Sequence, residues 1–165
     1  METATAPAID YKQLMIDTIR QAGATMVKDL RHIPEDKLNV SPMGCARPPL
    51  EFVAECAGFN GLIARAIRGE AGEIPSQEQR RAYYASIDTF EKAQNALENS
   101  VEALASALEQ ATDADLLRTT AAPWGEQVPI YRLASLCGYH MSYHDGQLNY
   151  IQCLYGDDKF HWMED

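Results

Sequence analysis

Hydrophobic residues recur at helical spacing along most of the chain, and this pattern predicts four helices. The first starts near Tyr11 and ends at Pro34, because proline cannot continue a helix. The second begins at the proline pair 48–49 and runs to about Gly69. An unbroken 4-3 rhythm predicts one long third helix over 83–111, and the fourth covers about 130–155. The intervening segments 35–47, 72–77 and 113–129 are predicted as loops without a convincing strand.

The predicted fourth helix has an apolar seam whose middle is polar. Its members follow a 4-3 spacing: Leu133, Cys137, His140, His144, Gln147, Ile151 and Leu154. An unsatisfied buried polar group costs about 1 to 3 kcal/mol, so the three polar positions need a metal, water or carboxylate as partner. Two histidines four residues apart lie on one helix face and can bind one metal ion. The alternative is a solvated face with an accidental pair.

A carboxylate stands in a similar apolar row on the predicted second helix. Glu55 lies between Phe52 and Phe59, where an ionised side chain needs a cation or strong donors. A bundle can bring Glu55 toward His140 and His144, and a metal would supply the cation. Three protein ligands leave coordination positions open, as in catalytic metal sites, where water or a thiol becomes a nucleophile at neutral pH.

The amino-acid composition limits which partners the protein is expected to bind and in which cell compartment we expect it. The 165 residues are 46% hydrophobic, with 14 Lys and Arg against 24 Asp and Glu, so the net charge is −10. Because the chain has no run of basic residues, we do not expect it to bind nucleic acid or anionic membranes. No apolar run approaches the ~18 residues that a membrane-spanning helix needs. Four scattered cysteines without a CxxC pair and an N-terminus without an apolar leader favour the cytoplasm. We expect a flexible N-terminus over 1–8 and a single domain over 9–165.

Several motifs together resemble a known family. The segment 140–151 reads HMSYHDGQLNYI and is followed by LYGD at 154–157; PWGE stands at 123–126 and LEFVAECA at 50–57. The chain resembles the DinB/YfiT-like metalloenzyme superfamily over nearly its whole length. The resemblance implies a four-helix bundle, frequent homodimers, and a metal, often nickel or zinc, bound by one histidine of the second helix and both histidines of the HxxxH pair. It also implies action on a small molecule, as in metal-dependent hydrolases, thiol-dependent transferases and a maleylpyruvate isomerase that uses a low-molecular-weight thiol.

The chain departs from the family at the first ligand, where Glu55 stands in place of the usual histidine. Two histidines and one carboxylate suit zinc, iron or manganese, and nickel is implied by the family. The predicted metal ligands are therefore His140, His144 and Glu55. Further candidates, for the pocket or for contacts to the ligands, are Gln147, Tyr143, Cys137, Cys56 and Asn60. For both cysteines, a small hydrophobic role in the core is the alternative.

Two function classes follow from these residues. One is a metal-dependent hydrolase or thiol-dependent transferase acting on a small molecule. The other is a non-catalytic bundle that has lost its metal, in which protonated histidine pairs with Glu55 and the protein binds a ligand or dimerises. Outside this group, we expect His32 to cap the first helix and His161 to lie in a tail that docks on its own bundle or on a second subunit. We expect Asp145 to support the ligands from behind, or to lie at the rim or in solvent.

Overall fold

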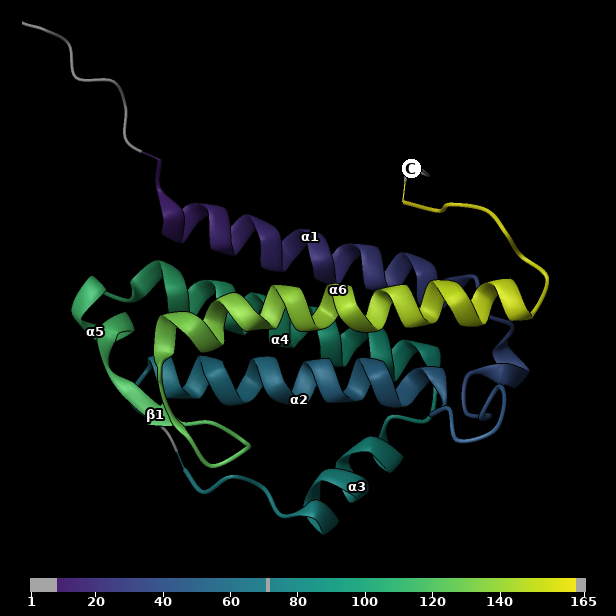
Figure 1. The fold of residues 1–165 in the computed structure, drawn as a ribbon, viewed down its shortest axis with the longest axis horizontal. Helices are drawn as coiled ribbons and strands as arrows, with labels where there is room; N and C mark the ends of the chain where they lie inside the picture. The colour runs from purple at the N-terminus through teal and green to yellow at the C-terminus, as the bar shows by residue number, and fades with distance from the viewer. Residues whose placement is uncertain (1–8, 71, 163–165) are drawn as a thin grey trace, which may run out of the picture.

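The structure is a computed structural model, which describes residues 9–70 and 72–162. Four long helices form an all-α bundle (Figure 1): α1 (Tyr11–Arg31), α2 (Pro49–Ile67), α4 (Phe90–Gln110) and α6 (Ile130–Leu154). Helices α1 and α2 each pack against both α4 and α6, which places α2 and α6 side by side. The predicted fold class is confirmed, and the expected flexible N-terminus at 1–8 lies outside the described residues.

Local sequence signals set the ends of these helices. Asp10 caps α1 by accepting hydrogen bonds from the backbone amides of Lys12 and Gln13 at 3.0 Å each. Helix α2 starts at Pro49, where the missing amide hydrogen costs nothing. Gly156, two residues after the end of α6, has φ 94°, a left-handed conformation that favours glycine and turns the chain back. The predicted ends of the first, second and fourth helices are therefore within two or three residues of those observed.

The prediction of one long third helix is wrong. The segment forms two helices, α3 (Gln77–Ser86) and α4, separated by residues 87–89. Thr89 starts α4 as its N-cap, accepting from the Lys92 amide at 3.2 Å, while Ile87 has ψ 80° and is not helical. Ile87 is nevertheless buried, so its place in the 4-3 rhythm reflected burial and not continuous helix.

The prediction that 113–129 lacks a strand is also wrong. This segment contains the short helix α5 (Asp113–Leu117) and the antiparallel strands β1 (Thr119–Ala121) and β2 (Gln127–Pro129). Strands of three residues are too short for alternation of polar and apolar positions to be visible in sequence. The loop after α1 likewise contains a 3-10 turn, η1 (Glu35–Lys37).

The long helices share one hydrophobic core, in which Met26, Leu97, Leu104 and Met141 are fully buried. Leu154 departs from the seam predicted on α6, because it lies at the end of the helix with 42% exposure. Among the described residues, no helix is long and apolar enough to span a membrane. All four cysteines are free thiols.

Candidate metal centre

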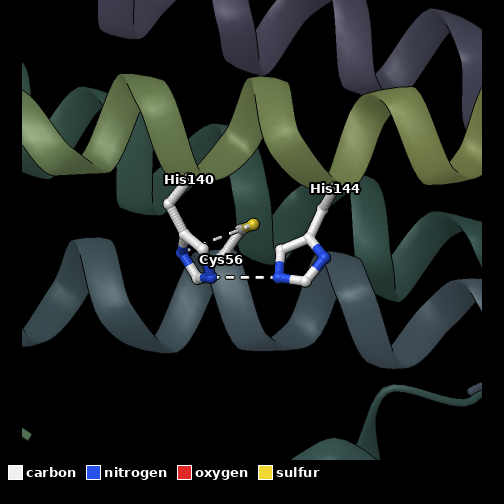
Figure 2. A group of neighbouring side chains, drawn as sticks. All are labelled: Cys56, His140 and His144. Carbon is white, nitrogen blue, oxygen red and sulfur yellow. Dashed lines mark hydrogen bonds between the residues drawn. The ribbon is translucent and has the colours of Figure 1, made fainter. Parts of the chain in front are cut away.

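The two histidines of α6 point toward α2 and toward each other (Figure 2). The Nε2 atoms of His140 and His144 lie 3.0 Å apart. An ion with metal–nitrogen distances of about 2.0 to 2.1 Å can contact two donors at this separation. His144 is nearly buried, with 4% of its side chain exposed, whereas His140 is 20% exposed. The pair therefore has one enclosed and one accessible member.

Glu55 of α2 lies beside the histidine pair. Its Oε1 lies 3.5 Å from His140 Nε2, and its Oε2 lies 3.9 Å from His144 Nε2. The structure also shows a partner that was not predicted, because the guanidinium of Arg47 donates to Glu55 Oε2. Arg47 lies in the loop before α2 and stacks over Phe52 at 4.8 Å from the ring centroid. A metal is therefore not required to supply a cation for Glu55, which corrects the expectation from the sequence.

The protonation of the group suits metal binding. Hydrogen bonds from His140 and Arg47 lower the pKa of Glu55 to about 2, so it is ionised at neutral pH. Burial lowers the pKa of His144, which keeps its imidazole neutral. His144 Nδ1 lies 2.6 Å from Gln147 Oε1, and a carbonyl oxygen can only accept, so Nδ1 carries the proton. This leaves the lone pair on His144 Nε2, directed at His140 and Glu55.

Cys56 approaches the pair from another side. Its Sγ lies 3.9 Å from Nδ1 of His140, and the ligand atoms of Cys56, His140 and His144 all fall within 4.8 Å of one another (Figure 2). Burial raises the pKa of the Cys56 thiol well above its usual range. Because the sulfur faces Nδ1 while Glu55 faces both Nε2 atoms, Glu55 is the better placed third ligand.

The remaining predicted residues occupy different environments. Tyr143 is 57% exposed and its ring meets that of His144 edge-on at 5.1 Å. Asn60 is buried and its amide nitrogen donates to Ser100 Oγ at 3.3 Å, so this nitrogen is engaged within the core. Cys137 donates to the carbonyl of Leu133 at 3.4 Å and is fully buried, so the alternative interpretation as a core residue describes its position.

Two cavities open beside the group. One, of about 790 Å³, contacts Glu55 and His140 and is walled by α3 and the β1–β2 turn, through Tyr83, Tyr84 and Trp124. The other, of about 410 Å³, contacts His144 and Gln147 together with Arg47 and Tyr143. Trp124 is the tryptophan of the PWGE motif, and its Nε1 donates to Glu126 at 2.8 Å. A small molecule can therefore approach the group from either side.

Aromatic rings hold the imidazoles in place. Phe52 stacks on His144 at 5.0 Å between centroids, and Phe59 meets His140 edge-on at 5.3 Å. Both phenylalanines were expected in an apolar row, but their contact with the imidazoles was not predicted. The available signal was their spacing around Glu55, three residues before it and four after it.

Asp145 is not at the rim or in solvent, so two of the three positions predicted for it are wrong. The residue is 5% exposed and lies against Asp29 of α1. Burial, together with the charge of Asp29, raises the pKa of Asp145. Asn149 donates to Asp29 Oδ2 and, at 3.0 Å, to the Asp145 carbonyl. Successive residues of a helix are turned by about 100°, so Asp145 points in a different direction from His144 and meets α1.

The fold and the site define a helical bundle with two histidines and one carboxylate gathered between adjacent helices. Chemically, this donor set fits a divalent transition metal, since one imidazole lone pair and an ionised carboxylate already converge. The chain belongs to the DinB superfamily, whose family model matches residues 18–148.

Solved structures show the same fold at low sequence identity. A mycothiol-dependent maleylpyruvate isomerase superposes with a TM-score of 0.68 and 16% identity, over 83% of this chain and 60% of the isomerase. A conserved protein from Enterococcus faecalis superposes with a TM-score of 0.71 and 16% identity, over 89% of this chain and 98% of that protein. This chain thus corresponds to about 60% of the isomerase's length. No curated protein matches the chain.

Proposed function

We propose that the protein is a metal-dependent enzyme that acts on a small molecule, with one divalent ion bound by Glu55, His140 and His144. The observation that carries the proposal is the convergence of these side chains: the two Nε2 atoms are 3.0 Å apart and the carboxylate oxygens lie 3.5 and 3.9 Å from them. Gln147 fixes the tautomer of His144 that leaves Nε2 as a ligand.

The reaction class we propose is hydrolysis or transfer to a low-molecular-weight thiol. A bound divalent ion would supply a Lewis acid and activate water or a thiol. The likeness to a mycothiol-dependent isomerase supports the thiol alternative. The cavity of about 790 Å³ supplies a place for a small substrate, because it reaches both Glu55 and His140. Zinc, nickel, iron and manganese are the proposed ions, since all accept imidazole with carboxylate.

A second candidate function is a non-catalytic bundle without metal, and the Arg47 contact favours it. The Arg47 guanidinium already neutralises Glu55, and the chain of contacts from Arg47 through Glu55 and the histidines to Gln147 can satisfy these polar groups internally. In this case the bundle binds a small ligand or serves as a dimerisation module. The homodimer and the cytoplasmic location remain predictions from the sequence.

Metal analysis separates the two candidates. Protein without an affinity tag is incubated with zinc, nickel, manganese or iron, and the bound ions are counted after removal of excess metal. We expect one ion to be lost in His144→Gln and in Glu55→Gln. Glu51→Gln, one helical turn earlier on α2, is the matched control and should bind as many ions as the wild type.

Arg47→Gln provides the discriminating variant. If Arg47 competes with the ion for Glu55, its removal should leave metal binding intact or strengthen it. If neither the wild-type protein nor Arg47→Gln binds more of any tested metal than the His140→Gln/His144→Gln double variant, the metal proposal is overturned. For a loaded protein, chelator-sensitive hydrolysis of esters or amides is then compared with transfer of a thiol to a small electrophile.

A further inference from the structure

A second group of possible metal ligands lies away from the candidate centre, where the C-terminal tail meets the end of α1. His32, Asp157 and His161 each offer one ligand atom, and these atoms all lie within 4.8 Å of one another. After α6 the chain turns back at Gly156 and runs alongside α1 (Figure 1). The group therefore joins two segments that are far apart in sequence.

Contacts that do not involve the three ligand side chains hold the tail in this position. Gln152 is 1% exposed, and its amide donates to the carbonyl oxygens of Lys159 at 3.0 Å and Asp157 at 3.5 Å. Trp162 donates from Nε1 to Asp29 Oδ2 at 2.9 Å. The tail is thus anchored on both sides of His161, which reduces the entropy cost of assembling a site there.

The donor atoms have the chemistry of a transition-metal site. The rings of His32 and His161 stack within 5° of parallel with their centroids 3.3 Å apart, and Asp157 Oδ2 lies 2.9 Å from His161 Nε2. Parallel rings direct their lone pairs in parallel, so an ion would tilt the rings toward each other. His161 is only 4% exposed, which encloses one ligand.

The local charge also favours a cation. His32 is the C-cap residue of α1, where the helix dipole presents partial negative charge. Asp157 adds a carboxylate oxygen, 2.9 Å from His161 Nε2.

We propose that His32, Asp157 and His161 form a second divalent metal site, which takes zinc or another ion that favours imidazole, such as nickel or cobalt, and fixes the tail to α1. The proposal is independent of the candidate centre, since the two groups share no residue. Without metal, the stacking of His32 on His161 and the contact of His161 with Asp157 would still hold the tail, and the experiment must distinguish these cases.

Zinc counting and affinity measurement on untagged protein form the first test. We expect two ions for each chain, one of which is lost in His32→Gln or His161→Gln. Asp157→Asn should weaken this site roughly 100-fold, whereas Asp158→Asn, the neighbouring exposed carboxylate, should not. His144→Gln removes the other ion. If the candidate centre binds no metal, one ion should remain in the wild type and disappear in His161→Gln, so the two proposals fail separately.

Fluorescence gives a readout at the tail itself. The chain has two tryptophans, so Trp124→Phe leaves Trp162, next to His161, as the single emitter. Cobalt or nickel should quench Trp162 in a saturable way, also in the His144→Gln background, and the quenching should vanish with His32→Gln. Circular dichroism checks that each variant is folded. If Trp162 does not respond to metal and the three tail variants bind as many ions as the wild type, the proposal is overturned.

Discussion

At the scale of single residues, Gln147 tests how the histidine pair is held. It fixes Nδ1 of His144 at 2.6 Å and thereby directs Nε2 toward His140. We predict that Gln147→Ala weakens zinc binding at the candidate centre about 10- to 100-fold, because the tautomer and orientation of His144 are no longer fixed. Competition with a chromophoric chelator measures this. Gln94→Ala, which removes an exposed contact to Glu98, is the control. Equal affinities for all three proteins would contradict the prediction.

The buried Asp145 predicts a pH dependence of stability. The pKa of Asp145 is raised in the folded state above the ordinary value of 3.8. At pH values between 3.8 and the raised pKa, the folded protein therefore keeps a proton on Asp145 that the unfolded chain has released. The free energy of unfolding therefore falls as pH rises from that value toward the raised pKa. Asparagine has no such proton to lose. Asp145→Asn should therefore be more stable than the wild type at pH 7.5, by about 1 to 3 kcal/mol, and lose this advantage near pH 4.

Urea unfolding at the two pH values, with chelator present, measures the Asp145 effect. Asp158→Asn is the control, because this aspartate is exposed. A gain in Asp145→Asn that is the same at both pH values would show that packing, and not titration, is responsible.

The residues of the site differ in how far sequence could reveal them. His140, His144 and Gln147 follow one another at 4-3 spacing on one helix, so periodicity alone places them on a common face. Arg47 lies in an irregular loop, and no periodicity predicts which side chain such a loop directs at Glu55. The contact of Asp145 with Asp29 was not predicted for a related reason: helix geometry gives the angle of Asp145 around α6, but not which neighbouring helix occupies that direction.

At the scale of elements, the close approach of α1 and α4 depends on Gly23. A Cβ at this position would lie 2.7 Å from Val101 Cγ2, too close for an ordinary contact. We predict that Gly23→Ala destabilises the protein by about 1 to 3 kcal/mol despite the higher helix propensity of alanine. Thermal and urea unfolding measure the change.

Gly61 provides the matched control on α2, since a Cβ there would meet no described atom within 4 Å. Gly61→Ala should stabilise the protein by about 0.5 to 1 kcal/mol. Adding Val101→Ala to Gly23→Ala should restore part of the loss by removing the clash. Destabilisation by both glycine substitutions alike would mean that the α1–α4 contact is not the cause.

Element boundaries show where the pattern of the sequence ceases to be informative. The long helices were predictable because each buries a stripe over many turns, and residues such as Asp10 and Pro49 mark their starts. The break at 87–89 was hidden because Ile87 stays buried and keeps the rhythm while its backbone leaves the helix. Thr89, an N-cap residue, was the overlooked signal.

At the scale of the whole molecule, the arrangement of the bundle determines which side chains can meet. Helices α2 and α6 are distant in sequence but adjacent in space, so Glu55 and the histidine pair become neighbours only when the bundle forms. Sequence predicted this meeting because a four-helix bundle allows it and the polar residues required it. The cavity walls contributed by α3 and the β1–β2 turn were not predictable, since they come from segments predicted as continuous helix and loop.

Helix α3 is stabilised differently from the bundle that it covers. None of the residues of α3 is buried, and among the described elements its main packing partner is α2. The helix also forms one wall of the cavity that reaches His140. Its local opening should therefore cost far less free energy than global unfolding. We predict that its amide hydrogens exchange with solvent deuterium orders of magnitude faster than those of α2 or α6, with no dependence on global stability. Access to the cavity would then be governed by a local unfolding equilibrium while the core stays intact.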